Sequence, residues 1–151
     1  MGTMMMFRRT LLLLAGLVAG MALAAQAAMA EQRIALVIGN AAYEKGPLKT
    51  SLADAGLVAE ALNSAGFEIV EGADLGQADL RARFRDFLTK VEGAGPDALV
   101  FVYFSGYGLE FEGENYVIPA DARLERDTDI PIDAVRLTDL IRPLAGTPAR
   151  K

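Results

Sequence analysis

The chain has 151 residues, with 15 Lys and Arg against 20 Asp and Glu, and it contains neither histidine nor cysteine. The lack of cysteine excludes disulfides, thiolate catalysis and cysteine metal sites within this polypeptide. A net charge of −5 argues against nucleic acid and anionic lipid as partners.

The first thirty residues have the pattern of a secretory signal peptide. Arg8 and Arg9 precede an apolar run, and small residues follow at Ala28 and Ala30. We therefore predict cleavage after Ala30 and a periplasmic or secreted location. The alternative is an uncleaved membrane anchor, because the apolar stretch approaches the ~20 residues that span a bilayer. Residues 31–151 hold 13 Lys and Arg against 20 Asp and Glu and have the size of one domain.

Three apolar runs predict the strands of a core sheet. Arg33 to Gly39 reads as a central strand buried on both faces, and Phe67 to Val70 as a short second strand. Asp97 to Phe104 is the most hydrophobic of the three, which is typical of a strand at the centre of a sheet.

Helices are predicted between these strands. The first begins at Ser51, with Asp54 as the acid of a capping box, and runs to Ala65. The second covers Ala78 to Val91 and carries a charged, solvated face. The order of strands and helices indicates an α/β fold that is doubly wound, with a mostly parallel sheet and helices on both faces.

The last third of the chain predicts a hairpin and a final helix. Leu109 to Phe111 and Tyr116 to Ile118 flank a turn with glycine available for a positive backbone angle. Asp121 to Asp129 reads as a loop, and its acids lack the spacing and glycine of a calcium loop, so we predict no metal and no other cofactor. Ile132 to Leu144 has helical spacing and is expected to break at Pro143.

Four segments together resemble the catalytic domain of the caspase and metacaspase superfamily, particularly its bacterial members. They are Arg33 to Tyr43, Pro47-Leu48 with Asp54-Ala55, Phe101 to Gly108, and Asn115 to Ala122. The resemblance implies a caspase-like domain over residues 31–151. It also implies a histidine in the loop after the third strand, which activates a cysteine at the end of a fourth.

The chain departs from that family pattern twice. Tyr107 stands at the histidine position, and the stretch for the cysteine would begin beyond Lys151. Tyrosine has a pKa near 10 and is a poor base at neutral pH. We therefore expect a catalytically inactive pseudo-peptidase that acts as a protein-binding or regulatory module. The alternative is part of a cysteine-type endopeptidase, with a preference for basic residues, whose nucleophile lies outside this chain.

The resemblance also suggests roles for single residues, each with a simpler reading beside it. Gly108 is similar to an oxyanion-hole glycine or is a turn glycine, and Asp54 lines a basic-residue pocket or is a helix-start acid. Asn40 and Tyr43 follow the first strand, where ligands bind open sheets, or they pack the loop. Tyr107 fills the space of the imidazole or contacts a ligand.

The family sheet pairs its third strand with a fourth, for which we predict no counterpart in this sequence. Such a truncated sheet would leave Asp97 to Phe104 as a long apolar edge, a template for pairing with another strand. We therefore expect a protein or peptide partner. A small-ligand binder is a weaker hypothesis, because Gly39 stands alone after the first strand and forms no phosphate-binding loop.

Overall fold

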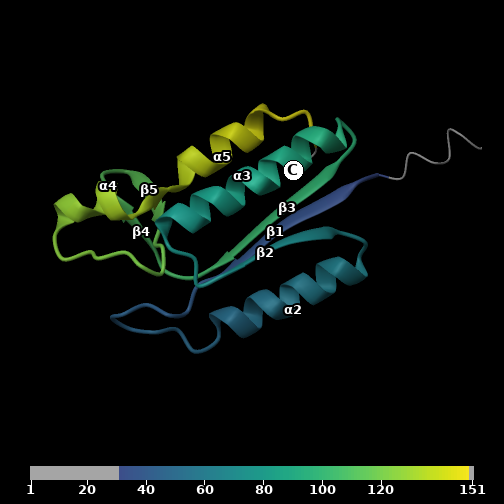
Figure 1. Ribbon diagram of the computed structural model, residues 1–151. Coiled ribbons are helices and arrows are strands. Elements are labelled where there is room, and N and C mark those ends of the chain that lie inside the picture. Colours follow the sequence, from purple (N-terminus) through teal and green to yellow (C-terminus); the bar gives the residue numbers. More distant parts are fainter. Residues whose placement is uncertain (1–30, 150–151) are drawn as a thin grey trace, which may run out of the picture. The chain divides into compact units, whose positions relative to one another are not determined.

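A parallel three-stranded sheet forms the centre of the computed structural model, which describes residues 31–149. Its order is β2-β1-β3, formed by β1 (Arg33–Gly39), β2 (Glu68–Ala73) and β3 (Leu99–Ser105) (Figure 1). Both neighbours run parallel to β1, which confirms the parallel α/β prediction. The signal-peptide prediction falls on residues 1–30 and lies outside the described residues.

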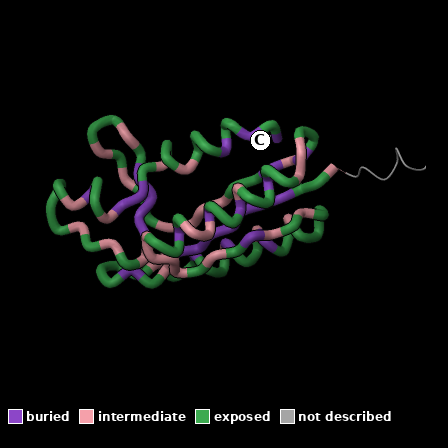
Figure 2. The backbone as a smooth tube through the Cα atoms, turned by 45° about the horizontal axis from the view of Figure 1, so that its top comes forward, coloured by how far each residue is buried: buried purple, intermediate pink, exposed green. Residues whose placement is uncertain are grey.

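Strand β1 is buried on both faces because helices cover both sides of the sheet. Ile34 and Leu36 face one core cluster, and Ala35 and Val37 face another. All four are at most 2% exposed. Figure 2 shows buried backbone running along the centre of the sheet, as the continuous apolar sequence predicts.

Helix α2 (Ser51–Ser64) covers one face, and α3 (Gln77–Ala94) and α5 (Leu137–Gly146) cover the other (Figure 1). The capping box predicted for α2 is wrong. Ser51 is the first helical residue and is buried, while Thr50 occupies the cap position without a side-chain cap hydrogen bond. Asp54 lies in the first helical turn, where the helix dipole favours a negative charge.

A second, antiparallel sheet follows β3 directly. It contains β4 (Gly108–Phe111), β5 (Glu114–Val117) and β6 (Val135–Arg136) in that order. The two-residue turn places Glu112 and Gly113 at positive φ values of 52° and 80°, which matches the right-handed twist of the flanking strands. The predicted hairpin is confirmed.

The predicted final helix is wrong in its organisation. The segment splits into α4 (Ile130–Asp133), β6 and α5, preceded by a 3-10 turn, η1 (Asp127–Asp129). Val135 is fully buried and pairs with Val117, so tertiary pairing interrupts the helical pattern there. Pro143, the expected break, lies inside α5.

Strand β3 lies at an edge of its sheet rather than at the centre. Within the described residues it pairs with β1 alone, and Phe101 and Val102 are 43% and 45% exposed. Strand β1 takes the central place, because it pairs with both other strands. The edge exposed on β3 is the apolar edge that the sequence led us to expect.

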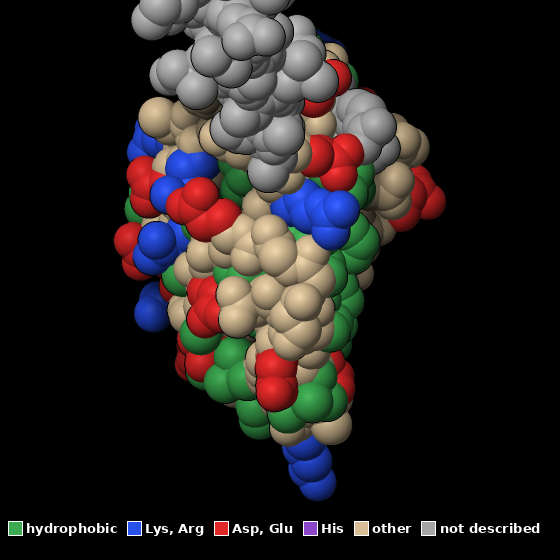
Figure 3. Space-filling model, turned by 90° about the vertical axis from the view of Figure 1, so that its right-hand side faces the viewer, with side chains coloured by type: hydrophobic (Ala, Val, Ile, Leu, Met, Phe, Trp, Pro, Cys, Tyr) green, Lys and Arg blue, Asp and Glu red, His purple; other side chains and the backbone are tan. Residues whose placement is uncertain are grey.

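The charged residues of α3 lie largely on its solvent side, as predicted. Lys90 pairs with Glu68 of β2, and Arg83 lies 3.8 Å from Asp86. On the face that Figure 3 shows, basic and acidic side chains are interspersed. Among residues 31–149, the structure contains no helix that has both the length and the hydropathy of a membrane span.

Candidate functional site

The loop that carries Tyr107 lies between two edge strands. Gly106 and Tyr107 connect the end of β3 to the start of β4, at the carboxyl end of the parallel sheet. Ligands bind open α/β sheets at this end. Tyr107 therefore lies at the end of the sheet where ligands bind in folds of this class.

Tyr43 supports this loop through its hydroxyl group. The Tyr107 backbone N–H donates to the Tyr43 hydroxyl oxygen at 3.0 Å, and that hydroxyl donates to the Ile118 carbonyl at 3.0 Å. Ile118 N–H in turn donates to the Tyr107 carbonyl at 2.9 Å. The Tyr43 hydroxyl thus replaces one direct bond at the open end of the β4–β5 ladder. Burial raises the pKa of Tyr43, and the bond from Tyr107 opposes that shift more weakly.

Tyr107 itself is 41% exposed and presents its ring to solvent. Its ring lies 4.8 Å from that of Tyr43, centroid to centroid, at an interplanar angle of 56°. Within the part of the chain that the structure describes, the Tyr107 hydroxyl has no hydrogen-bond partner. The side chain is therefore partly packed on Tyr43 and partly available for contact.

Gly106 allows the close approach of Tyr43. A Cβ atom at Gly106 would lie 2.6 Å from the Tyr43 hydroxyl oxygen and 2.7 Å from the Phe104 ring. Real Cβ atoms essentially never come so near, so any larger residue would displace the Tyr43 ring or the loop. The glycine in this position is needed for packing.

Gly108 is exposed and extended, at the first position of β4. It lies opposite Val117. In the flanking pair, the Ile118 N–H donates directly to the Tyr107 carbonyl, and the Tyr43 hydroxyl bridges the Tyr107 N–H to the Ile118 carbonyl. Antiparallel ladders alternate bonded and non-bonded pairs, so the N–H and C=O of Gly108 point away from β5. The orientation of this N–H is compatible with the oxyanion-hole role suggested by the resemblance.

Asn40 is fully buried and forms hydrogen bonds to residues at the ends of both neighbouring strands. Its Nδ2 donates to the Leu75 carbonyl at 3.2 Å, and its Oδ1 accepts from the Leu75 N–H at 2.9 Å. Its backbone N–H donates to the Ser105 carbonyl at 2.8 Å. Both the amide nitrogen and the amide oxygen of the Asn40 side chain are hydrogen-bonded to Leu75, which agrees with the interpretation that Asn40 packs the loop.

Two acids form hydrogen bonds at the same end of the sheet. Sequence reasoning gave Asp74 no role and considered Asp121 only as one acid of the loop that runs to Asp129. Asp74, at φ 50°, accepts from the N–H groups of Ala41 and Ala42 at 2.7 and 2.8 Å. Asp121 accepts from the Gln77 N–H at 2.9 Å, at the start of α3. Both contacts join segments more than thirty residues apart, so no local pattern could have shown them.

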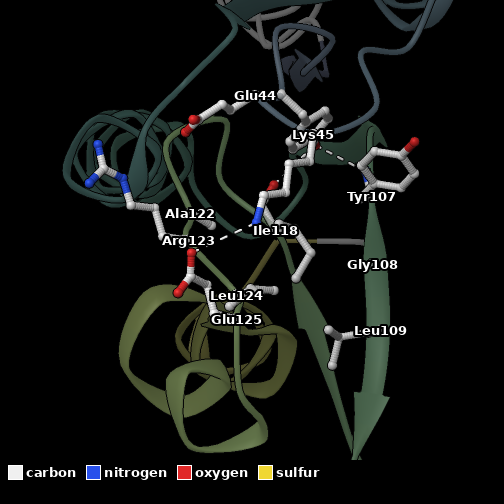
Figure 4. A pocket seen from close by; sticks show the side chains of 11 residues that line it. Glu44, Lys45, Tyr107, Gly108, Leu109, Ile118, Ala122, Arg123, Leu124 and Glu125 are labelled. Carbon is white, nitrogen blue, oxygen red and sulfur yellow. Dashed lines mark hydrogen bonds and ion pairs between the residues drawn. The ribbon is translucent and has the colours of Figure 1, made fainter.

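A cavity of about 450 Å³ opens beside Tyr107 (Figure 4). Its apolar wall contains Leu109, Ile118 and Leu124, and Lys45 pairs with Glu125 at 3.8 Å across it. The other lining residues are Tyr43, Glu44, Gly108, Ala122 and Arg123.

The cavity brings together only part of the predicted site. Tyr107 and Gly108 line it, together with Tyr43, whereas Asn40 and Asp54 do not. Asp54 lies in the first turn of α2. The predicted substrate-binding roles of Asn40 and Asp54 stay predictions. Among the described residues no group of three or more acids is placed to hold a metal ion.

Comparison with known families agrees with this architecture. The model of the caspase domain family matches residues 32–149, more than three quarters of the chain. The chain belongs to the caspase domain family. The resemblance drawn from its sequence segments is thereby confirmed, together with the α/β fold.

Two curated proteins are similar to this caspase domain. Human mucosa-associated lymphoid tissue lymphoma translocation protein 1 is 30% identical over 95 residues, which cover 62% of this chain. Its mouse homolog is 28% identical over 95 residues. In both cases the match spans 11% of the length of the relative, so the activities of the whole relatives do not carry over directly.

Proposed function

We propose that this caspase domain is an exported, non-hydrolytic module that binds a protein or peptide segment in the cavity beside Tyr107. The observation that carries the proposal is that Tyr107 lines this cavity and is exposed. A tyrosine stands at the position of the family histidine, and the given sequence contains no cysteine to act as nucleophile.

The lining of the cavity supports a peptide ligand. Aromatic and aliphatic side chains line it together with four charged residues. Peptide sites commonly combine an apolar pocket with a polar rim. A regulatory role follows if the bound segment belongs to another protein.

Binding and cleavage by the full chain, measured with a fluorescent peptide pool, test this proposal. We expect saturable binding without hydrolysis, and a loss of roughly tenfold in affinity for Tyr107→Ala, because tyrosines dominate many binding interfaces. Leu57→Ala, on an exposed position of α2, is the control and should leave binding unchanged. Hydrolysis by the chain alone, or equal affinity for Tyr107→Ala, would contradict the proposal.

A second candidate is part of a cysteine-type endopeptidase whose nucleophile lies outside this chain. The outward N–H of Gly108 favours it, since that group could stabilise an oxyanion. Adding a cysteine-bearing partner together with Tyr107→His should then produce cleavage after basic residues. Failure of that combination to cleave any basic-site peptide would remove this candidate.

Export is proposed from the sequence of residues 1–30. The intact mass of the protein isolated from its source decides whether these residues are removed. A mass that retains them would favour the membrane-anchored alternative.

A further inference from the structure

Strand β4 has an open edge beside the cavity. It is the outer strand of the β4-β5-β6 sheet among the described residues, and it pairs with β5 alone. Figure 4 shows β4 as the outer strand next to the cavity, with Tyr107, Gly108 and Leu109 along it. An edge strand presents unpaired N–H and C=O groups to any extended chain that approaches it.

The ladder register identifies which groups are unpaired. Because Tyr107 and Ile118 form a bonded pair, the pairs Gly108–Val117 and Glu110–Asn115 are the non-bonded ones. The N–H and C=O groups of Gly108 and Glu110 therefore point outward from β4. Together they offer two donors and two acceptors, enough for one short strand.

Side chains alternate between the two faces of this edge. Leu109 lies on the face that lines the cavity, and Glu110 is exposed on the opposite face. In an antiparallel pair, directly opposite residues project to the same face. A residue opposite Leu109 would therefore enter the cavity, and a residue opposite Glu110 would lie beside its carboxylate.

The negative charge of the hairpin favours a particular kind of residue opposite Glu110. Between Gly108 and Ile118 there are three glutamates, Glu110, Glu112 and Glu114, and neither lysine nor arginine. Glu110 Oε1 accepts from the Gly113 N–H at 2.9 Å, which holds the carboxylate close to the hairpin. A positively charged side chain is the favourable cross-strand neighbour of such a group.

We propose that an extended peptide adds to the free edge of β4 as an antiparallel strand, with Lys or Arg opposite Glu110 and a large apolar residue opposite Leu109. This inference rests on the proposed peptide-binding function and specifies its ligand. Since the chains run in opposite directions, the basic residue comes immediately before the apolar one. The recognised element is thus an ordered dipeptide, such as Lys-Phe.

Blocked, fluorophore-labelled hexapeptides provide the test on the full chain. The probe is Thr-Thr-Lys-Phe-Thr-Thr, and its control has the central order Phe-Lys. We expect the Lys-Phe peptide to bind about tenfold more tightly, because only this order satisfies the cavity and Glu110 together. N-methylation of the lysine nitrogen, which removes the donor to the Glu110 carbonyl, should lower affinity about tenfold. N-methylation of the phenylalanine nitrogen, which points away from β4, should change it less than twofold.

Glu110→Gln tests the charge contact, because glutamine retains the oxygen that accepts from Gly113. We expect roughly fivefold weaker binding of the Lys-Phe peptide and no change for a Gln-Phe peptide. Glu60→Gln, an equal charge change on the exposed side of α2, should change neither. Bound peptide should also slow hydrogen exchange of the Gly108 and Glu110 amides.

The outcomes separate the two proposals. If pool peptides bind in a Tyr107-dependent way but order, N-methylation and Glu110→Gln have no effect, strand addition to β4 is overturned and the peptide-binding function stands. If neither the pool nor the Lys-Phe peptide binds, both proposals are overturned.

Discussion

The Tyr43 hydroxyl occupies a place that a backbone bond usually takes. It accepts from the Tyr107 N–H and donates to the Ile118 carbonyl, and it does so in a buried position. One phenol therefore satisfies two backbone groups that neither strand satisfies otherwise. The position of the Tyr107 loop depends on this group.

Tyr43→Phe removes the hydroxyl and leaves both backbone groups unpaired. We expect a loss of about 1–3 kcal/mol in the free energy of unfolding, measured by urea titration. Tyr107→Phe is the matched control. It removes the same hydroxyl group at a position where, among the described residues, that group has no hydrogen-bond partner. That control should change stability by less than about 0.5 kcal/mol. Equal effects of the two substitutions would contradict the role assigned to Tyr43.

The pH dependence of stability offers a separate test of Tyr43. Its pKa is raised in the folded protein above the ordinary value of 10.0, chiefly by burial. The folded state therefore retains a proton that the unfolded chain loses, and stability falls as the pH rises above about 10. We expect the free energy of unfolding to decrease more steeply in the parent chain than in Tyr43→Phe between about pH 9.5 and 11. Parallel curves would contradict a raised pKa.

At the scale of elements, α2 packs unusually close to the end of β1. A Cβ atom at Gly39 would lie 2.8 Å from the Ser51 carbonyl oxygen and 2.9 Å from the Ala55 Cβ. Backbone cannot move aside as a flexible side chain can. Gly39 therefore sets the distance between the strand and the helix.

Gly39→Ala should destabilise the protein by about 1–3 kcal/mol, the usual range for forced overpacking. Gly56→Ala makes the same chemical change in α2, where a Cβ would meet nothing within 4 Å. It should instead stabilise by about 0.4–1 kcal/mol, because alanine reduces the entropy of the unfolded chain. Thermal midpoints that move in the same direction for both variants would refute the close-packing account.

Elements with a clear local pattern could be predicted from the sequence, and those set by distant contacts could not. Arg33–Gly39 forms a central strand as predicted, since its apolar run has no other stable place. Val135–Arg136 reads as helix locally but pairs with β5. In the same way Tyr107 and Gly108 could be placed on one loop, whereas the contacts of Asp74 and Asp121 depend on chain segments far away in sequence.

At the scale of the molecule, the open edge of β3 is an exposed apolar surface in the part of the chain that the structure describes. Val102 and Phe101 are exposed there, and Ile141 of α5 is 51% exposed near the same edge, where it lines an apolar cavity with Val102. We propose that this edge pairs with another strand, because long apolar edges promote association.

Val102→Lys should prevent such association. We expect the parent chain to associate with increasing concentration in sedimentation experiments and the variant to remain monomeric, since a lysine at an edge disfavours strand pairing. Ile132→Lys adds the same charge at a 68% exposed position of α4 and should not prevent association. A parent chain that is monomeric at every concentration would argue against strand pairing at the β3 edge.

The two open edges, β3 and β4, are separated by only Gly106 and Tyr107. A strand that docks on β3 fixes the start of this two-residue connection, and a peptide on β4 fixes its end. If docking at one edge changes the affinity of the other, the change must be reciprocal, with the same factor in both directions. In that case the occupancy of one edge would set the affinity of the other through a connection of only two residues.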